Sequence, residues 1–431
     1  MRTSWQKRRG EDTAGEMVPD AVPAAEHERI GTGRHRRTER AIAHGDDRPV
    51  PIIAFSKDWN GDHTSNHHVL RELAKTRRVV WLNSIGTRAP SLASARDLKT
   101  IRKKLVDVAR GPVKVENDLW VATPLVLPMA QRPIAKALNR WMVEGFVRAI
   151  RARLGIDRFQ LWTFLPNVAD YLGMGEELSV YYCVDEWSLF EYLDKQTIVE
   201  HERELLRRVD AVFAINHALA DAKRELNATT FVSPHGVDHE LFAKALDPDV
   251  VIPADLAALP HPRIGFYGTL REWVDMELIA GIAKRRPQWS IVLIGQQLSD
   301  VSALAKLPNV HLLGARPHAE LPAYCAGFDV GLIPYRTQER MTYVNPLKLR
   351  EYLAAGLPVI STPIAEAERY PGLCQIASDA DGFVAAIERV LKSDSRAARL
   401  DRSRAMTDET WASRVECVAR RVDEVAQRGI R

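Results

Sequence analysis

The sequence predicts an α/β protein built of two similar halves, each with a doubly wound parallel sheet. Apolar runs of strand length alternate with helical patterns in both halves, for example at 52–55, 79–82 and 290–295. Strand, glycine-bearing loop, helix and strand in this order open such a sheet. With 431 residues, of which 46% are hydrophobic, the chain has material for two domains of roughly 150–200 residues each.

The bulk composition excludes several classes of protein. The formal net charge is only +4, with 60 basic against 56 acidic residues, so a nucleic-acid-binding protein is not indicated. The cysteines are scattered without Cys-x-x-Cys spacing, which argues against a disulfide framework or structural zinc: Cys183, Cys325, Cys374 and Cys417. No apolar run has transmembrane length, and the N-terminus lacks a signal-peptide core. We therefore expect a cytoplasmic protein, or one attached peripherally at the inner membrane face.

Composition shifts along the chain predict its domain boundaries. Residues 1–48 are rich in Arg, Glu, Asp, Gly and Ala, with Trp5 as the single Phe, Tyr or Trp, so we expect a disordered tail. A proline-rich passage marks the linker. The predicted parts are a first Rossmann-like domain at 49–245, the linker at 246–262, a second Rossmann-like domain at 263–405, and a C-terminal segment at 406–431 whose helix packs back on the first domain.

The loop at 56–63 follows the first predicted strand and lies at the carboxyl edge of the sheet, where ligands bind in this architecture. His63, His67 and His68 lie in or near this loop, but no carboxylate stands at a helical ligand spacing from them. We therefore predict loop or ligand-pocket histidines and no metal site.

Three further strands are predicted in the first half, at 159–163, 179–184 and 211–215. The middle one ends in Asp185, which places a carboxylate on the rim of the sheet where chemistry happens in doubly wound folds. The alternative is that Asp185 caps the following helix. The next helix, which contains Glu202 and Glu204, is predicted to have a structural role only.

The stretch between 102 and 158 is basic and contains an amphipathic helix that opens at Pro133. A basic helix with Trp and Phe suits an anionic membrane surface, which we assign to residues 125–153. The alternative is a core-facing helix with a solvated basic back. The basic residues are Arg102, Lys103, Lys104, Arg110, Lys114, Arg132, Lys136, Arg140, Arg148, Arg151, Arg153 and Arg158, and the apolar helical positions are Ile134, Leu138, Trp141, Met142, Phe146 and Ile150.

The stretch 345–361 predicts a helix whose first turn binds an anion. Asn345 is expected to cap the helix, with the proline that follows in the first helical position, and Gly356 to end it. The free amides of Leu347 and Lys348, with the lysine charge, would bind phosphate. Glu351, on the same face, would accept hydrogen bonds from ribose hydroxyls. The alternative is an ordinary helix with an exposed Lys–Glu pair.

These motifs carry a family resemblance. Ser-Pro-His-Gly-Val-Asp at 233–238, Phe-Tyr-Gly-Thr-Leu at 266–270, and Asn-Pro-Leu-Lys-x-x-Glu-Tyr-Leu-Ala-x-Gly-x-Pro-Val-Ile-Ser at 345–361 resemble nucleotide-sugar glycosyltransferases of the GT-B fold. The nearest likeness is to bacterial exopolysaccharide or teichuronic-acid-type transferases. The resemblance runs from about residue 50 to about 425, and implies two Rossmann-like domains facing a cleft.

The resemblance implies a donor site in the second domain and an acceptor site in the first. Glu351 would bind the ribose, Lys348 and the 345–348 amides the diphosphate, and the 313–316 loop the base, unless that loop is a plain connection. The donor-binding residues are predicted as Gly268, Thr269, Arg271, Arg316, Asn345, Leu347, Lys348 and Glu351, and the acceptor-side residues as Asp58, Gly61 and His63.

The chain departs from the retaining members of that family. Their two glutamates are eight positions apart, and counting back from Glu351 reaches Tyr343. Thr269 stands where an arginine usually follows the glycine, which leaves Lys348 as the main phosphate cation, with Arg271 as a helper. We therefore expect an inverting transfer with Asp185 as the general base.

The predicted function is transfer of a sugar from a nucleotide-sugar to a hydroxyl of a lipid-linked or polysaccharide acceptor. The nucleotide-sugar is a substrate, and no cofactor or metal is expected. Two alternatives remain: a UDP-sugar epimerase of the same fold, and a catalytically inactive nucleotide-sugar-binding subunit. The sequence specifies neither the sugar, the nucleobase nor the acceptor.

Overall fold

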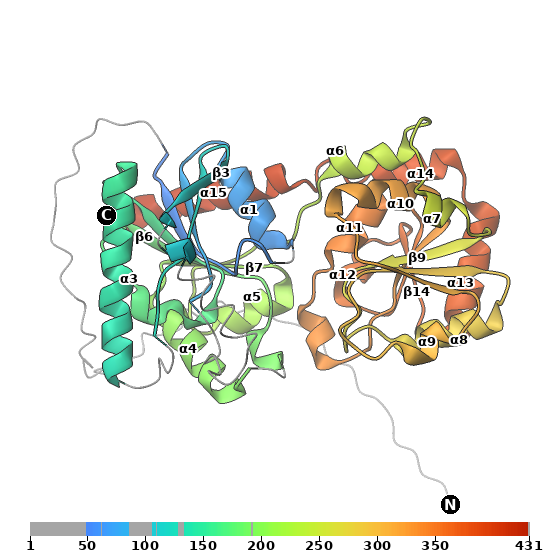
Figure 1. Cartoon of the computed structure of the whole chain (residues 1–431), viewed down its shortest axis with the longest axis horizontal. Helices are drawn as coiled ribbons and strands as arrows, with labels where there is room; N and C mark the ends of the chain where they lie inside the picture. The colour runs from blue at the N-terminus through green and yellow to red at the C-terminus, as the bar shows by residue number, and fades with distance from the viewer. Residues whose placement is uncertain are drawn as a thin grey trace, which may run out of the picture. The chain divides into compact units, whose positions relative to one another are not determined.

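The structure is a computed structural model that describes residues 49–61, 63–85, 106–108, 110–127, 133–190 and 193–429. It contains two parallel sheets with helices on both faces, which confirms the predicted α/β class (Figure 1). The tail predicted at 1–48 lies outside the described residues. We call the part around the first sheet the first lobe and the part around the second sheet the second lobe.

The sheet of the first lobe has eight strands in the order β3-β4-β2-β1-β5-β6-β7-β8. The central strand β1 pairs in parallel with β2 and β5, with Ile53 opposite Val80 and Leu161. The strands are β1 Ile52–Phe55, β2 Val79–Leu82, β3 Val113–Glu116, β4 Leu119–Ala122, β5 Gln160–Thr163, β6 Leu178–Cys183, β7 Ala211–Ala214 and β8 Thr230–Val232.

The hairpin β3–β4 is not predicted by the sequence, which assigns these residues to a basic stretch. Its strands pair antiparallel across a turn in which Asn117 adopts a φ of 41°, a left-handed conformation that asparagine tolerates. The side chains of β3 are mostly exposed, because β3 lies at the edge of the sheet. The strand therefore lacks the continuous apolar run that reveals buried parallel strands.

Helix α15, at the C-terminal end of the described chain, belongs to the core of the first lobe. Trp411, Val415, Val418 and Val422 lie in the same apolar cluster as strand β1. The helices of this lobe are α1 Ser65–Leu73, α3 Pro133–Leu154, η1 Pro166–Tyr171, η2 Trp187–Leu189, α4 Lys195–Arg208, α5 His217–Arg224 and α15 Trp411–Gly429.

The sheet of the second lobe has six parallel strands in the order β11-β10-β9-β12-β13-β14. Helices α10 and α11 cover one face, and α8, α9 and α13 the other (Figure 1). The strands are β9 Arg263–Tyr267, β10 Ser290–Ile294, β11 Val310–Gly314, β12 Val330–Ile333, β13 Val359–Ser361 and β14 Cys374–Ile376. The helices are α8 Met276–Arg285, α9 Ser302–Ala305, η4 His318–Glu320, α10 Leu321–Gly327, η5 Glu339–Tyr343, α11 Leu347–Ala354, α12 Ala365–Glu368, α13 Ala380–Ser393 and α14 Arg396–Arg404.

The core of the second lobe begins earlier than the sequence boundaries suggest. Val237, Phe242 and Ala245 pack in the second core, although the sequence assigns residues up to 245 to the first domain. The predicted linker contributes buried Leu256 to the same core. These residues form the short helices α6 His239–Phe242, η3 Ala243–Leu246 and α7 Ala254–Ala257.

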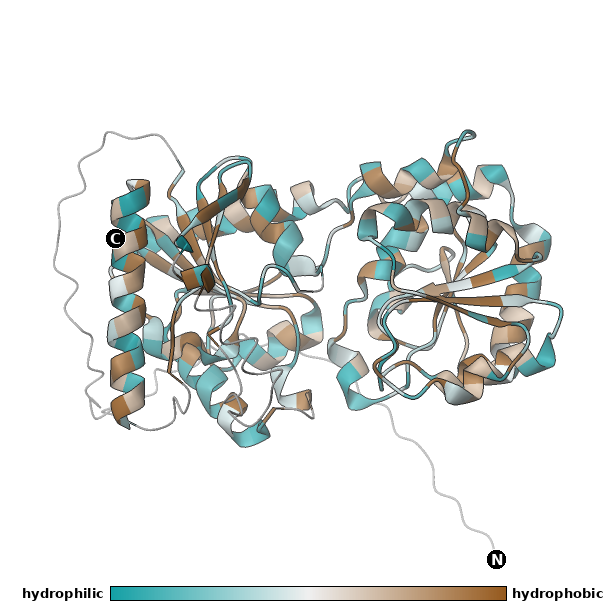
Figure 2. Cartoon of the chain, viewed as in Figure 1, coloured by the Kyte–Doolittle hydropathy of each residue, from teal (hydrophilic) through white to brown (hydrophobic). Residues whose placement is uncertain are grey.

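The buried face of helix α3 coincides with the predicted apolar positions only at Ile150. Its buried positions are Asn139, Val143, Val147 and Ile150, whereas the side chain of Ile134 is 84% and that of Trp141 71% exposed. Brown apolar positions and teal polar ones alternate along this helix in Figure 2. No helix in the described ranges is long and apolar enough to cross a membrane.

The basic back of α3 is more neutralised than the sequence suggests. Lys136 pairs at 2.6 Å with Asp170, which the fold brings to the helix, and Arg148 pairs at 3.1 Å with Glu144 of the same helix, so acids compensate these charges. Arg140 donates to backbone carbonyl oxygens, one of them that of Leu172 at 3.1 Å. Arg102, Lys103, Lys104 and Arg132 of the predicted basic stretch lie outside the described residues.

Candidate functional site

Two glycine turns meet at the carboxyl ends of β9 and β10. Gly268 has a φ of +136° and donates its N–H to the Ile294 carbonyl at 2.8 Å. A Cβ on Gly295 would lie 2.0 Å from the Gly268 carbonyl oxygen, so only glycine fits there. Thr269 follows directly, with its N–H 3.3 Å from the same Cβ position. Because neither glycine carries a side chain, the main chain at this turn can be approached closely by a ligand.

Helix α11 brings Lys348 to this turn. A Cβ on Gly268 would lie 2.9 Å from the Cε and 3.1 Å from the Nζ of Lys348. The Lys348 ammonium donates to the Tyr335 hydroxyl at 2.8 Å and lies 5.6 Å from the centre of the Phe266 ring. No carboxylate pairs with Lys348 within the described ranges. Its positive charge is therefore available beside the glycine turn.

Glu351 lies one helical turn further on and is buried. The Tyr267 hydroxyl donates to its Oε2 at 2.8 Å, and His318 Nε2 lies 2.9 Å from its Oε1. Burial opposes protonation of His318, but the hydrogen bond and charge of Glu351 raise the pKa of this imidazole above its usual value. Lys348 and Glu351 thus both reach the end of β9, and the carboxylate is held in a fixed orientation.

The start of α11 differs from the prediction. The helix begins at Leu347 with Pro346 at the N-cap position, and no side chain caps it, so the predicted Asn345 cap is wrong. The Asn345 amide instead donates to the Ile215 carbonyl at 2.7 Å and accepts from Arg350 at 2.6 Å. The Leu347 side chain packs against the first core, while its amide lies in the first turn, which has no partners within the helix.

The buried side chain of Arg350 anchors α11 to neighbouring segments through ion pairs. Its guanidinium pairs with Glu366 and, at 3.3 Å, with Glu409. Burial alone would lower the pKa of Arg350, but Tyr370 and these carboxylates raise it. Gly356 ends the helix with a φ of +76°, as predicted. The first turn of α11 is therefore held rigidly by a charge network that the sequence motif does not reveal.

Asp185 follows β6 in the first lobe, and its side chain is 28% exposed. Its Oδ1 accepts the Glu186 N–H at 3.1 Å, and its Oδ2 lies 3.5 Å from Nη2 of Arg340. Burial raises the pKa of Asp185 to about 6, against the lowering effect of Arg340. The capping alternative for Asp185 does not hold, because Glu186 caps η2 by accepting the Ser188 N–H.

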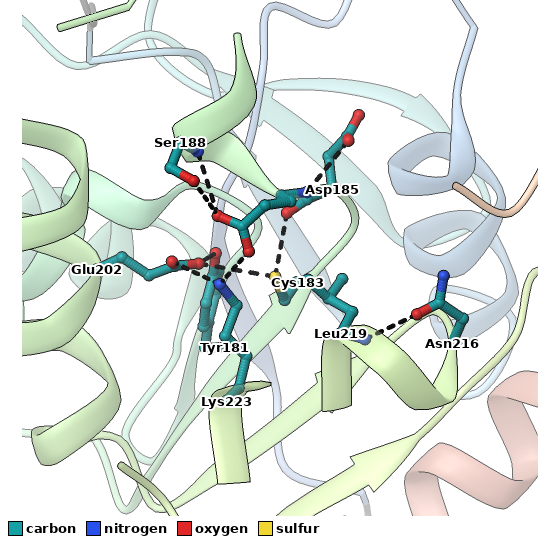
Figure 3. A network of polar contacts seen from close by, with 9 residues as sticks. Tyr181, Cys183, Asp185, Ser188, Glu202, Asn216, Leu219 and Lys223 are labelled. Atoms are coloured by element: carbon teal, nitrogen blue, oxygen red, sulfur yellow. Dashed lines mark hydrogen bonds and ion pairs between the residues drawn. The ribbon is translucent and has the colours of Figure 1, made fainter. Parts of the chain in front are cut away.

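A buried ion cluster lies next to Asp185 (Figure 3). The Lys223 ammonium lies 2.7 Å from Glu186 Oε2 and 2.7 Å from Glu202 Oε2. The Tyr181 hydroxyl donates to the other oxygen of Glu202 at 2.7 Å. The sequence treats the helix of Glu202 as scaffold, because the partner lysine is distant in the chain. The cluster ties β6, α4 and α5 together around the loop that carries Asp185.

The Asp185 side chain points away from this cluster, while its backbone is held by it (Figure 3). Cys183 Sγ donates to the Asp185 carbonyl at 3.3 Å. The carboxylate is therefore presented at the sheet rim by a rigid loop. The four cysteines are free, consistent with the predicted reduced state.

The predicted acceptor-side loop turns back on itself after β1. Gly61 donates its N–H to the Asp58 carbonyl at 3.0 Å, and Asp58 Oδ1 accepts the Ser84 N–H at 3.1 Å. Asp58 and Gly61 are exposed. Both therefore shape the loop while remaining open to solvent.

His63 of the same loop contacts the second lobe. Its ring stacks on His318, with centroids 5.2 Å apart and planes 22° apart, and its Nε2 lies 2.6 Å from Nη1 of Arg71. Burial, together with neighbouring His67, His318 and Arg71, lowers the pKa of His63 to about 3. The imidazole is neutral at physiological pH. Over the described ranges, no group of His, Cys, Asp and Glu is arranged to hold a metal ion.

The other two predicted donor-site cations, Arg316 and Arg271, contact groups outside the cluster of Gly268, Lys348 and Glu351. The Arg316 guanidinium pairs with Asp255 at 2.8 Å and donates to the Tyr324 hydroxyl at 2.7 Å, so its donors are already used. Arg271 lies with its guanidinium 5.4 Å from the centre of the Trp273 ring. The structure brings together Gly268, Lys348 and Glu351, and leaves Arg316 with partners of its own.

Comparison with known proteins identifies the class that this fold and site define. Residues 261–393 match the family described as "Glycosyl transferases group 1", and this range contains every predicted donor-binding residue. The chain therefore carries a glycosyltransferase group 1 domain within a GT-B fold.

A curated relative matches about half of the chain. The chain is 29% identical over 233 residues to TuaH of Bacillus subtilis (strain 168), whose name assigns it to teichuronic acid biosynthesis as a glycosyltransferase. The match covers 49% of this chain and 58% of that relative's length.

Solved structures share the architecture at low identity. Sucrose-phosphate synthase from Thermosynechococcus elongatus superposes with a TM-score of 0.61 at 17% identity, covering 89% of this chain and 99% of that one. An E. coli structure described as trehalose-6-phosphate bound with UDP-2-fluoro glucose gives 0.60 at 14%, covering 88% and 99%. A trehalose-6-phosphate synthase described for glycosyl transfer with retention gives 0.58 at 15%, covering 86% and 99%. These likenesses establish the fold.

Proposed function

We propose that this chain is a glycosyltransferase that moves a sugar from a nucleotide-sugar donor to an acceptor hydroxyl. The observation that carries the proposal is the joint placement of Lys348 and Glu351 at the end of β9, beside Gly268 and Tyr267. A cation and a buried carboxylate next to a tight glycine turn and a helix N-terminus suit the diphosphate and ribose of one ligand. The match of the same residues to the group 1 family supports this reading.

The donor would lie with its diphosphate at Gly268, Lys348 and the first amides of α11. Positive charge there stabilises the negative charge that grows on the departing nucleoside diphosphate. Glu351 would accept hydrogen bonds from ribose hydroxyls, because each carboxylate oxygen has acceptor capacity beyond its bond to Tyr267 or His318.

Asp185 would act as the general base. The acceptor hydroxyl gives its proton to the Asp185 carboxylate while its oxygen bonds to the anomeric carbon, and the bond from that carbon to the diphosphate oxygen breaks. A carboxylate with a pKa of about 6 is ionised at neutral pH yet more basic than an ordinary aspartate. Direct displacement of this kind inverts the anomeric configuration.

The donor is tested first by calorimetry against UDP-, GDP- and dTDP-sugars. We expect one class to bind, and nucleotide release to require both donor and a lipid-linked or glycan acceptor. Sugar isomerisation without acceptor would indicate an epimerase, and binding without release would indicate an inactive subunit. If no nucleotide-sugar binds, the proposal is refuted.

The stereochemistry is tested by NMR of the product's anomeric proton. We expect inversion, and an Asp185→Asn protein that binds donor normally but turns over at least a hundredfold more slowly, a loss typical of removing a general base. Retention, as described for the trehalose-6-phosphate synthase neighbour, would exclude Asp185 as the base of a direct displacement.

We further propose that a lipid-linked acceptor is reached at a membrane surface through α3. The exposed side chains of Ile134 and Trp141 lie on one helix, and Leu125, Trp141, Met142 and Phe146 line a hollow of about 240 Å³ beside it. Because ion pairs neutralise part of the basic back, apolar insertion rather than charge would provide most of the affinity.

Vesicle sedimentation tests this placement. We expect Trp141→Ala to reduce binding to anionic vesicles several-fold, whereas Val251→Ala, at a residue 82% exposed in the second lobe, leaves binding unchanged. Equal binding of the two variants would show that α3 is not the membrane contact.

A further inference from the structure

We propose that Arg340 is a second cation of the donor site and binds the diphosphate beside Lys348. The inference rests on the proposed function and adds a residue that no sequence motif marks. A nucleoside diphosphate carries two or more negative charges at its phosphates, and Lys348 supplies one compensating positive charge. A guanidinium nearby would complete the neutralisation and could bind phosphate oxygens in a bidentate manner.

A short antiparallel contact joins the segment that Arg340 contacts to the segment that Lys348 contacts. The segment around Trp273 pairs with that around Tyr335: Val274 forms a bridge with Tyr335, and the Arg336 N–H donates to the Trp273 carbonyl at 2.9 Å. Lys348 bonds to the hydroxyl of the same Tyr335 at 2.8 Å. Lys348 and the Trp273 backbone therefore both bond to the segment that contains Tyr335 and Arg336.

Arg340 lies against that ring. Its guanidinium carbon is 4.6 Å from the centre of the Trp273 ring and 4.1 Å from the centre of the Phe190 ring. Arg271 contacts the same indole at 5.4 Å, so two guanidinium groups gather there. Contacts with two aromatic rings restrict the Arg340 side chain, so that less conformational entropy is lost on binding an anion.

The hydrogen-bond donors of Arg340 are largely unused. The side chain is 13% exposed, and its one ion pair within the described ranges is the 3.5 Å contact with Asp185. The buried Nε has no hydrogen-bond partner among the residues that the structure describes. A guanidinium has five N–H groups, and a buried one without an acceptor is costly. A phosphate oxygen would satisfy it.

With its diphosphate bound to Arg340, the donor would put this guanidinium between the proposed base and the leaving group. One edge of the guanidinium faces the carboxylate that takes the acceptor proton, and the remaining donors are available to the diphosphate. A cation in this position would stabilise the separating negative charge while keeping Asp185 ionised.

Calorimetry with UDP, GDP and dTDP, each paired with its monophosphate, tests the inference. We expect Arg340→Ala to weaken binding of the preferred diphosphate on the order of 10- to 100-fold, the loss of a charge-assisted hydrogen bond. The monophosphate should be weakened less, because it presents fewer phosphate charges. Arg340→Lys should restore part of the loss, and Arg336→Ala, four positions upstream on the same segment, should bind as the wild type does.

Two results would overturn the inference. One is an Arg340→Ala protein that binds the diphosphate within twofold of wild type. The other is equal weakening of diphosphate and monophosphate with no rescue by lysine, which would indicate a structural role. A wild-type protein that binds none of the three diphosphates would instead refute the proposed function, so the two failures are distinguishable.

Discussion

Replacing Asp185 by asparagine should stabilise the folded protein at neutral pH while it removes the proposed activity. Burial raises the pKa of Asp185 from 3.8 to about 6, so the folded protein holds an ionised carboxylate in a place that disfavours its charge. Active sites commonly carry such a cost, because catalytic groups are held in environments that suit the reaction rather than the fold.

The magnitude follows from linkage. A shift of about two pKa units, at 1.36 kcal/mol each, corresponds to at most about 3 kcal/mol. The gain will be smaller, about 1–2 kcal/mol, because the Asp185 side chain is 28% exposed and solvent screens part of this cost. For a raised pKa, the stability present at low pH is lost as the pH rises, here between about 4 and 6. The advantage of the variant should therefore appear across this interval and level off above it.

Thermal melting of the two proteins from pH 4 to pH 8 provides the assay. At about 2–4 °C per kcal/mol for a domain of this size, the variant should melt a few degrees higher at pH 8 and near the wild type at pH 4. The partly buried His63, with a pKa lowered to about 3, destabilises both proteins equally in acid, and its effect cancels in the difference. A melting difference that does not change with pH would refute the reasoning.

Two other substitutions test the surroundings of the site. Lys223→Met should leave two buried carboxylates, that of Glu202 among them, without their cation, at a cost of about 3–5 kcal/mol at pH 8. The loss in melting temperature should be smaller at pH 5, because a carboxylate then takes up a proton. An equal loss at both pH values would contradict this prediction. Gly295→Ala should abolish nucleotide binding and lower the melting temperature, because its Cβ would lie 2.0 Å from the Gly268 carbonyl oxygen. The control Gly145→Ala meets open space inside helix α3, so it should leave binding unchanged and should not lower the melting temperature, because alanine is favoured over glycine within a helix.

Much of the fold could be predicted because parallel strands buried on both faces read as continuous apolar runs. Strands such as β1 and β10, and the left-handed Gly356 that ends α11, lie where the sequence indicates. The hairpin β3–β4 could not be predicted in this way, because an exposed edge strand needs no continuous apolar run. Its one local signal is Asn117, in a turn between two short alternating segments.

The arrangement of the proposed donor residues could be predicted only as far as they share one helix. Lys348 and Glu351 are three positions apart, so helical geometry alone places them on one face. What that face meets is a property of the fold: Tyr267 and His318, which hold Glu351, come from β9 and from the segment after β11. Asn345 shows that local chemistry can also mislead. Its side chain suits a helix cap, but in the folded protein it bonds to the Ile215 carbonyl of the other lobe.

The pairing of Asp185 with Arg340 lay beyond any local pattern. The two residues are 155 positions apart, and neither belongs to a motif that names the other. The role of each residue can be interpreted once the fold is known. Asp185 is a carboxylate at the rim of one sheet, and Arg340 is a guanidinium that packs against Trp273 and Phe190 and has an unpaired N–H group among the described residues. A charge buried without full partners costs free energy unless something else binds it, and we infer that the diphosphate of the proposed donor is that partner. The incompletely satisfied arginine is therefore stronger evidence for an anionic ligand than a fully paired one such as Arg316.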